Sequence, residues 1–384
     1  MPLPFGSVRR RMAGPYLRRV IPFAVSPHEV QIVWGDAFPG PVLVTLEGRR
    51  FVVQHGGGPG GLVIDGLTPA TSYQATVRPA HSTASAQVSF VTLSPPPGPE
   101  LGRVVTVSDL HIGAWRHGLL RPMIDRSGHQ IPHATRCAQA ALAEADRFHP
   151  DLVVVKGDLT NHGWHGHWNE VASILHTVSQ PLAIAPGNHD VGEVSEDDAA
   201  RALAIRGLPC ADPISVTDLP GVRVIVLDST VPGHSEGQWA KSQEALLDAA
   251  AEADRPCLVC LHHPPERWPI PSGYPIGIPW PASAKGLAAL RRAQPRLLVT
   301  AGHTHRNRRY RLSGVEVSEV ASTKDYPGVW AGYAIHEGGI RQVVQRTLAP
   351  EAMAWTEQTR QTMGGIWGRY SPGTLSDRCF VHRW

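Results

Sequence analysis

The stretch Leu-Ala-Ile-Ala-Pro-Gly-Asn-His-Asp (182–190) places four apolar residues directly before a turn that carries Asn188, His189 and Asp190. A short apolar run that ends at Pro and Gly is typical of a buried strand. Four other stretches share this design, in which an apolar run stops at polar groups: Asp109-Leu-His111, Gly-Asp158, Leu-His262-His263 and Gly-His303-Thr-His305.

Between most of these runs lie segments with the apolar spacing of a helix, at residues 135–148, 168–178, 241–253 and 284–293. Strands that alternate with helices predict an α/β sheet layer with helices packed on its faces. Open sheets of this kind bind ligands beyond the carboxyl ends of their strands. The polar groups that follow the strands are therefore expected to gather in one pocket.

The chain changes character at the stiff Pro-rich stretch 94–99 (Ser-Pro-Pro-Pro-Gly-Pro). Before it, short alternating runs such as Val30, Ile32 and Trp34 are separated by Gly and Pro turns, which predicts a small all-β, immunoglobulin-like sandwich. This part resembles a fibronectin type III module and the N-terminal domain of purple acid phosphatases. The expected domains are 1–93, a linker at 94–100, a catalytic domain at 101–349, and a tail at 350–384 that packs on it.

Composition excludes several classes of protein. The 384 residues are 42% hydrophobic and 18% charged, which indicates a globular protein. The net charge of +3 is too small to create the positive field that attracts nucleic acids or anionic membranes. No apolar run reaches the roughly 18 residues of a membrane span, and Arg18 and Arg19 interrupt the only candidate signal segment. We expect a cytoplasmic location. The five scattered Cys predict packing thiols rather than disulfides.

The collected side chains suit metal ions. Carboxylate oxygen, amide oxygen and imidazole nitrogen are the mixed ligands that Zn, Mn and Fe prefer. Seven donors exceed what one ion with an open position needs, but they fit two adjacent ions that share a carboxylate. Asp158 is the natural bridge, because its two oxygens can each take one metal. The predicted donors are Asp109, His111, Asp158, Asn188, His262, His303 and His305.

The order of the five blocks resembles the calcineurin-like metallophosphoesterase superfamily, over about residues 101–345. The resemblance implies an α/β (α+β) four-layer fold, a β-sandwich flanked by helices, with a binuclear centre of divalent or trivalent Fe, Mn or Zn. One ion would take Asp109, His111, Asp158 and His305, and the other Asp158, Asn188, His262 and His303. His189 would hold the phosphoryl group or protonate the leaving oxygen, and Asp190 would orient His189.

The blocks also resemble a particular branch of that superfamily. Purple acid phosphatases lack the first histidine and carry a Tyr three residues after Gly-Asp, whereas this chain has His111 and Asn161. The blocks look more like class III cyclic-nucleotide phosphodiesterases and related glycerophosphodiesterases. We therefore expect a metal-bridging hydroxide to attack the phosphorus of a small phosphodiester. One alternative is a phosphomonoesterase or nuclease of the same superfamily. The other is a non-enzymatic binding or scaffold protein.

Three flanking stretches bear on the substrate. Residues 161–168, rich in His and Trp, either wall the site, with Trp164 stacked on a base, or simply begin a helix. Arg306, Arg308 and Arg309 either hold a second phosphate or lie on a solvated strand. The proline-rich residues 264–281 predict a rigid lid or a partner surface. The small phosphate ester is the only partner that the sequence predicts.

Overall fold

The protein is described by a computed structural model that covers residues 17–80, 82–118, 123–125, 130–192, 195, 198–269 and 275–384. The N-terminal arginines 9–11 lie outside the described residues, as does part of the proline-rich stretch, at 270–274. Among the described helices, none combines the length and the apolar composition that a bilayer crossing needs.

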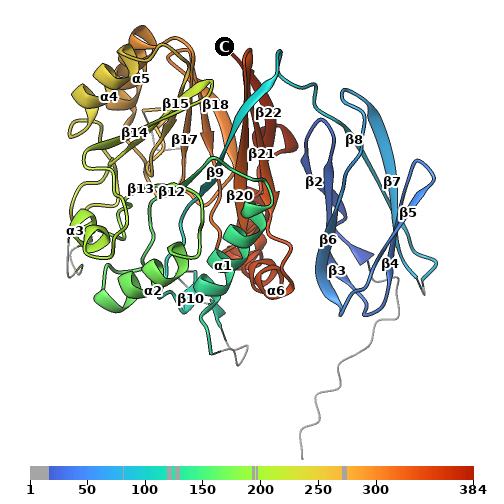
Figure 1. Ribbon diagram of the computed structural model, residues 1–384. Helices are drawn as coiled ribbons and strands as arrows, with labels where there is room; N and C mark the ends of the chain where they lie inside the picture. Colours follow the sequence, from blue (N-terminus) through green and yellow to red (C-terminus); the bar gives the residue numbers. More distant parts are fainter. Residues whose placement is uncertain are drawn as a thin grey trace, which may run out of the picture.

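Residues 17–91 form two small antiparallel sheets that face each other (Figure 1). Their cores meet at Trp34, which is fully buried, and at the alternating Val42, Val44 and Leu46. This arrangement is the expected β-sandwich. One sheet contains β1 (Leu17–Arg18), β2 (Ile21–Val25), β3 (Val30–Ala37) and β6 (Gly58–Ile64), and the other contains β4 (Val42–Leu46), β5 (Arg49–Val53), β7 (Ser72–Pro79) and β8 (Ala86–Val91).

The larger part of the chain contains two six-stranded mixed sheets. The first has the order β13 (Leu182–Ala185), β12 (Leu152–Lys156), β9 (Glu100–Val107), β20 (Val329–His336), β21 (Gly339–Arg346) and β22 (Cys379–Arg383). The second has the order β14 (Ile214–Leu219), β15 (Val222–Leu227), β16 (Cys257–Cys260), β17 (Leu297–Ala301), β19 (Val315–Glu319) and β18 (Arg308–Leu312). In each sheet the strands before the predicted polar blocks run parallel, so their carboxyl ends share one edge.

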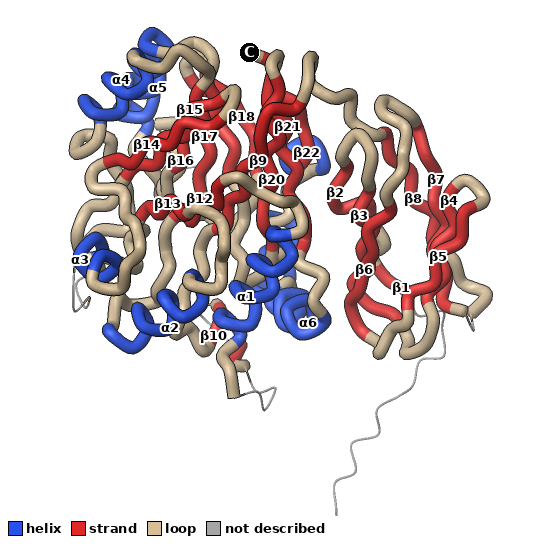
Figure 2. Tube along the Cα trace, viewed as in Figure 1, coloured by secondary structure: helices blue, strands red, loops and turns tan. Residues whose placement is uncertain are grey.

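Four layers result, and they confirm the predicted fold class. The two sheets pack on each other through residues such as Val154 and Leu258. The outer face of the first sheet is covered by α1 (His133–Asp146), α2 (His165–Leu175) and α3 (Ala199–Ala204), and that of the second by α4 (Gln243–Ala251) and α5 (Trp280–Ala293) (Figure 2). Cys257 and Cys260 pack on opposite faces of β16, as residues three apart on a strand should.

The C-terminal segment after residue 349 folds back onto both parts of the protein. It contains α6 (Pro350–Thr359), the 3-10 turn η1 (Thr362–Gly365), α7 (Trp367–Tyr370) and α8 (Leu375–Arg378), and it ends in β22, which pairs with β21. The Arg378 side chain also donates a 2.8 Å hydrogen bond to the Phe23 carbonyl in the small sandwich.

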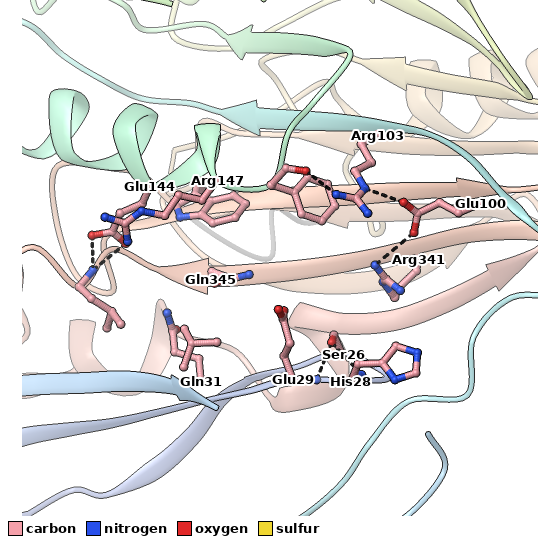
Figure 3. A pocket seen from close by; sticks show the side chains of 14 residues that line it. Ser26, His28, Glu29, Gln31, Glu100, Arg103, Glu144, Arg147, Arg341 and Gln345 are labelled. Carbon is pink, nitrogen blue, oxygen red and sulfur yellow. Dashed lines mark hydrogen bonds and ion pairs between the residues drawn. The ribbon is translucent and has the colours of Figure 1, made fainter. Parts of the chain in front are cut away.

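A cavity of about 420 Å³ lies between the small sandwich and the first large sheet. Figure 3 shows Glu29 and Gln31 on one side of it and Arg103, Glu144 and Arg147 on the other. Arg103 is paired with Glu100, and the Glu144 carboxylate accepts from the backbone at Leu348 and Ala349. Polar contacts therefore line much of the boundary between the two parts.

Candidate metal centre

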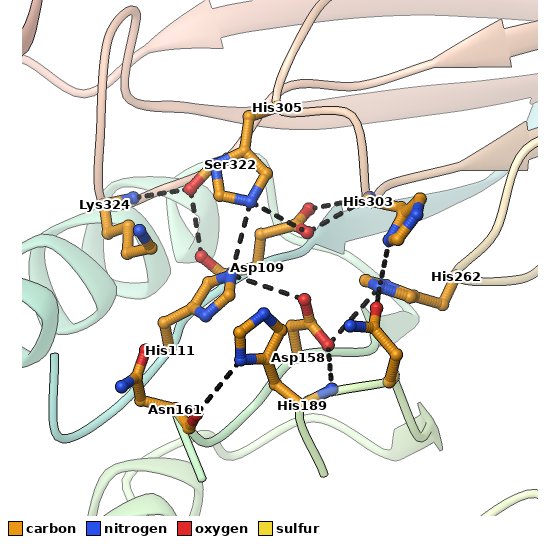
Figure 4. A network of polar contacts seen from close by, with 12 residues as sticks. Asp109, His111, Asp158, Asn161, His189, His262, His303, His305, Ser322 and Lys324 are labelled. Carbon is orange, nitrogen blue, oxygen red and sulfur yellow. Dashed lines mark hydrogen bonds and ion pairs between the residues drawn. The ribbon is translucent and has the colours of Figure 1, made fainter. Parts of the chain in front are cut away.

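Four of the seven predicted donors form one half of a polar cluster (Figure 4). His111 Nε2 lies 3.2 Å from His305 Nε2 and 3.3 Å from Asp158 Oδ2, and His305 Nε2 lies 3.4 Å from Asp109 Oδ1. These groups come from the loops that follow β9, β12 and β17, so both large sheets contribute.

The other half of the cluster uses the second oxygen of Asp158. His262 Nε2 lies 3.4 Å from Asp158 Oδ1, 3.2 Å from Asn188 Oδ1 and 3.1 Å from His303 Nδ1. His263, the next residue in the sequence, instead places Nδ1 2.9 Å from Ser229 Oγ. Asp158 thus separates two groups of donors, one at each of its carboxylate oxygens.

These separations match what metal ions require. Two donors bound to one tetrahedral ion at about 2.1 Å lie roughly 3.4 Å apart. The nitrogen and oxygen atoms of both halves are 3.1–3.4 Å from their neighbours. The residues present therefore fit two ions with Asp158 between them.

The second nitrogen of three rings is fixed by an acceptor. His305 Nδ1 lies 2.6 Å from Asp325 Oδ2, His262 Nδ1 lies 2.8 Å from the Lys156 carbonyl, and His303 Nε2 lies 3.0 Å from the Ile276 carbonyl. Because these oxygens only accept, each ring carries its proton there and turns an unprotonated nitrogen toward the cluster. This arrangement is the usual support for metal-binding histidines.

The electrostatics of the pocket call for positive charge. Burial alone would raise the pKa of Asp158, but His262, His189 and His111 hold that pKa well below its usual value. Burial opposes charge on the rings as well, yet Asp158 and Asp109 raise the pKa of His262 to about 9, and Asp325 and Asp109 raise that of His305 to about 10. The carboxylates of the pocket therefore favour positive charge beside these two rings, whether a proton or a metal ion supplies it at the second nitrogen.

The backbone is left-handed at five of the predicted donors. The φ angles are positive at Asp109 (56°), His111 (47°), Asp158 (48°), His303 (69°) and His305 (50°). Asp, Asn and His tolerate this region better than most residues, but each such residue still costs on the order of 1 kcal/mol. Strain of this kind collects at functional sites, where surrounding structure holds it in place.

His189 lies beside the cluster, with its ring centroid 4.6 Å from that of His111. Its Nδ1 lies 3.0 Å from the Asn161 carbonyl, so the expected contact with Asp190 was wrong. Asp190 instead accepts from the backbone of Leu159, Thr160 and Gly187 and from the Thr160 hydroxyl. The buried Asp190 carboxylate therefore joins the loop after β12 to the loop after β13.

The three flanking arginines form ion pairs with buried glutamates. Arg306 and Arg308 both pair with the fully buried Glu319, at 2.8 and 3.0 Å, and Arg309 pairs with Glu316. The Arg306 side chain is 6% exposed, whereas those of Arg308 and Arg309, on strand β18, are 22% and 29% exposed. Asn161, which stands at the position of the purple-enzyme Tyr, bonds through Nδ2 to His162 Nε2 at 2.8 Å.

Sequence reasoning missed Asp325. It lies in the loop after β19, which is parallel to β17 and ends at the same sheet edge as the five predicted blocks. The signal was weak, since Ser322-Thr-Lys-Asp325 follows Val-Glu-Val-Ser-Glu-Val-Ala (315–321), in which two Glu and a Ser interrupt the apolar residues.

A fold of four layers with paired donor groups at one sheet edge defines a class of metal-dependent phosphoesterases. The chain belongs to the calcineurin-like phosphoesterase family, whose profile matches residues 102–307. That match includes all seven predicted donors.

Three curated relatives share part of this region. The chain is 30% identical over 181 residues to a probable cyclic nucleotide phosphodiesterase of Rhodococcus erythropolis, covering 45% of this chain and 58% of the relative. It is 30% identical over 168 residues to the glycerophosphodiester phosphodiesterase GpdQ of Enterobacter lignolyticus (41% and 57%), and 28% over 182 residues to a cAMP/cGMP dual specificity phosphodiesterase of Mycobacterium tuberculosis (45% and 54%). The chain thus spans little more than half the length of these relatives.

Solved structures are similar at low identity. A dimetal phosphatase from Danio rerio is 15% identical with a TM-score of 0.47, over 65% of this chain and 97% of that one. A purple acid phosphatase from yellow lupin is 14% identical with a TM-score of 0.46, over 87% of this chain and 72% of that one.

Proposed function

We propose that the chain is a binuclear metal-dependent phosphodiesterase that hydrolyses small phosphodiesters of the cyclic nucleotide or glycerophosphodiester type. The observation that carries this proposal is the division of donors between the two oxygens of Asp158, with His262 at 3.4 Å from one and His111 at 3.3 Å from the other. The names of the relatives support a diester substrate.

The proposed ligand sets follow this division: Asp109, His111, Asp158 and His305 for one ion, and Asp158, Asn188, His262 and His303 for the other. Fe, Mn and Zn all suit such mixed nitrogen and oxygen donors. When bound, two such ions neutralise charge on the phosphate ester and bring the pKa of a water toward neutrality.

His189 is proposed as the residue that handles the leaving oxygen. Its Nδ1 proton is directed to the Asn161 carbonyl, which leaves Nε2 for a substrate at the cluster, where a ring nitrogen of His189 lies within 4.8 Å of ligand atoms of His111 and Asp158. With both nitrogens protonated, the ring can donate its Nε2 proton to an oxygen that departs from phosphorus. Asp190 is a positioning residue, because it holds the loops of Asp158 and Asn188 together.

The test combines metal analysis with diesterase kinetics on the purified chain, using bis(p-nitrophenyl) phosphate, p-nitrophenyl phosphate and cyclic AMP. We expect two ions per chain and a preference for diesters. His189→Ala should lower kcat by about 10²- to 10⁴-fold and keep both ions, whereas Asp158→Asn should lose metal. The exposed His234→Ala and Asp248→Asn are the matched controls.

Two outcomes would contradict the proposal. Full turnover by His189→Ala would contradict the role assigned to His189. Two tightly held ions in Asp158→Asn would contradict the assignment of Asp158 as a ligand of both ions. A preference for p-nitrophenyl phosphate would favour the phosphomonoesterase alternative, and a chain that binds no metal and hydrolyses no ester would favour a scaffold.

A further inference from the structure

Three aromatic rings pack together after Asp158, those of His162 and Trp164 in the loop and that of His167 in the first turn of α2. The Trp164 indole lies 4.9 Å from the His162 imidazole and 5.1 Å from the His167 imidazole, centroid to centroid, with interplanar angles of 33° and 28°. The two imidazoles are 6.2 Å apart. Rings on opposite faces of an indole would be about 7 Å apart or more, because each stacked layer adds at least 3.5 Å. Both imidazoles therefore back the same side of Trp164.

Much of Trp164 remains accessible to solvent. Its side chain is 45% exposed, although an indole is a large apolar group that usually contributes to a core. Trp164 occupies the N-cap position of α2 but makes no side-chain cap hydrogen bond there. Since Ser, Thr, Asp and Asn are the residues that stabilise this position, helix formation gives no reason for a Trp.

This ring stack is anchored to the candidate metal centre. Asn161 accepts from His189 through its carbonyl at 3.0 Å, and its side-chain nitrogen meets His162 Nε2 at 2.8 Å. On the other side, His167 packs against Gly113, where an added Cβ would lie 2.1 Å from His167 Nε2. The stack thus rests on the loops that carry His189 and His111.

We infer that the exposed face of Trp164 is a stacking subsite for a flat aromatic group bonded to the scissile phosphate, such as a nucleobase. This inference rests on the proposed diesterase function. Stacking of a base on an aromatic side chain contributes about 1–3 kcal/mol, which corresponds to roughly 5- to 150-fold in kcat/KM. The metal centre would bind the phosphate of aromatic and aliphatic esters equally well, and the subsite would add affinity for the aromatic ones.

Trp164→Asn separates this role from a structural one. Asn is a favourable N-cap, so the variant should unfold at the same or a higher urea concentration than the wild type. Its kcat/KM for cyclic AMP should fall 10- to 100-fold, while that for glycerophosphocholine stays within about twofold. Trp164→Phe should keep most of the cyclic AMP activity. Trp268→Asn, at a position that is also exposed (54%), is the control and should leave kcat/KM for both substrates unchanged.

Binding of AMP to the metal-loaded protein, measured by equilibrium dialysis, tests the subsite independently of turnover. We expect the dissociation constant to rise about tenfold or more in Trp164→Asn. Equal losses for both substrates, or unchanged kinetics and AMP binding, would overturn the inference. A wild type that binds two ions but hydrolyses no diester would overturn the proposed function, and the AMP measurement would still decide on the subsite.

Discussion

At the scale of single residues, glycines give the candidate ligands their room. An added Cβ at Gly157 would lie 2.5 Å from the His262 ring, and one at Gly302 would lie 2.8 Å from Asp109 Oδ2. At Gly187 the added atom would lie 2.2 Å from Asp158 N and 2.3 Å from Asp158 Oδ1. Contacts this short force the neighbour to move, so these glycines set the position of the donors.

Gly187→Ala is therefore expected to displace Asp158 from between the two donor groups. Misplacement by about 1 Å can cost on the order of 10²-fold in rate. We expect kcat/KM for a diester to fall by at least that factor and metal content to fall with it, as measured by elemental analysis. Gly192→Ala is the control in the same loop, because its nearest atom would be 3.7 Å away. Equal activity of the two variants would refute this account.

The sequence marks the candidate donors but not the contacts that support them. Side chains such as Asp109 and His305 stand in recognisable spacings after strands. The atoms that orient the rings of His262, His303 and His189 are main-chain carbonyls of Lys156, Ile276 and Asn161. Every residue has a carbonyl, so no sequence pattern marks the ones that are used.

At the scale of elements, helix α1 begins with a buried titratable group. His133 is fully buried, and its ring stacks on Trp355 of α6 with centroids 3.9 Å apart. Burial, with Lys324 next, lowers the pKa of His133 to about 3, against 6.5 in an unfolded chain. The folded protein thus disfavours the proton, so this contribution to stability is present above pH 6.5 and is lost as the pH falls toward 3.

His133→Phe should make the protein less sensitive to acid. At pH 5.0 the folded state pays about 2 kcal/mol for keeping His133 neutral, at 1.36 kcal/mol per pH unit. Between pH 7.5 and 5.0, the wild type should therefore lose about 2 kcal/mol more unfolding free energy than the variant, measured with urea at both values. His234→Phe, at an exposed position, should behave like the wild type. A loss as large in His133→Phe would contradict this role.

Element prediction succeeded where apolar runs are strong and failed where they are not. The runs at 152–155 and 182–185 correspond to β12 and β13 within one residue. Strand β18 (Arg308–Leu312) was expected only as one of two alternatives, and β22 (Cys379–Arg383) was not predicted, because charged residues break the apolar pattern of both. Their side chains are held by ion pairs and ring contacts instead, such as Arg309 over Phe380 at 4.1 Å.

At the scale of the whole molecule, the small sandwich is joined to the first large sheet by specific hydrogen bonds. Gln31 Nε2 donates to the Arg346 carbonyl at 2.8 Å, and the Arg346 amide donates to Gln31 Oε1 at 2.9 Å. The amide of Val25 also meets Cys379 Sγ at 3.3 Å. The first two bonds are buried, and they join a side chain of β3 to the main chain at the end of β21.

Gln31→Leu keeps the size of the side chain but leaves two main-chain groups of Arg346 without partners. Each buried unsatisfied group costs about 1–3 kcal/mol, so unfolding free energy of the full chain should fall by roughly 2–5 kcal/mol in urea. Gln74→Leu, at an exposed position of β7, should change it by less than about 0.5 kcal/mol. Equal stability of both variants would show that the joint contributes nothing.

This joint was beyond sequence reasoning. Gln31 and Arg346 are 315 residues apart, and neither belongs to a motif. The two cores, by contrast, follow from local alternation on either side of the Pro-rich stretch 94–99. Local periodicity therefore predicts the type of core in each part. The contact between the two parts depends on polar residues that are distant in the sequence.

The left-handed backbone at Asp109, His111, Asp158, His303 and His305 also limits which mutations the centre can explore. Only Gly, Asn, Asp and His enter that conformation readily, and β-branched residues are the most strongly disfavoured. The backbone conformation thus restricts which residue types can occupy these positions, and the permitted types include three that bind metals, Asn, Asp and His. A library that seeks new metal preference here should draw on Asn, Asp and His at these positions and place its diversity in the surrounding loops.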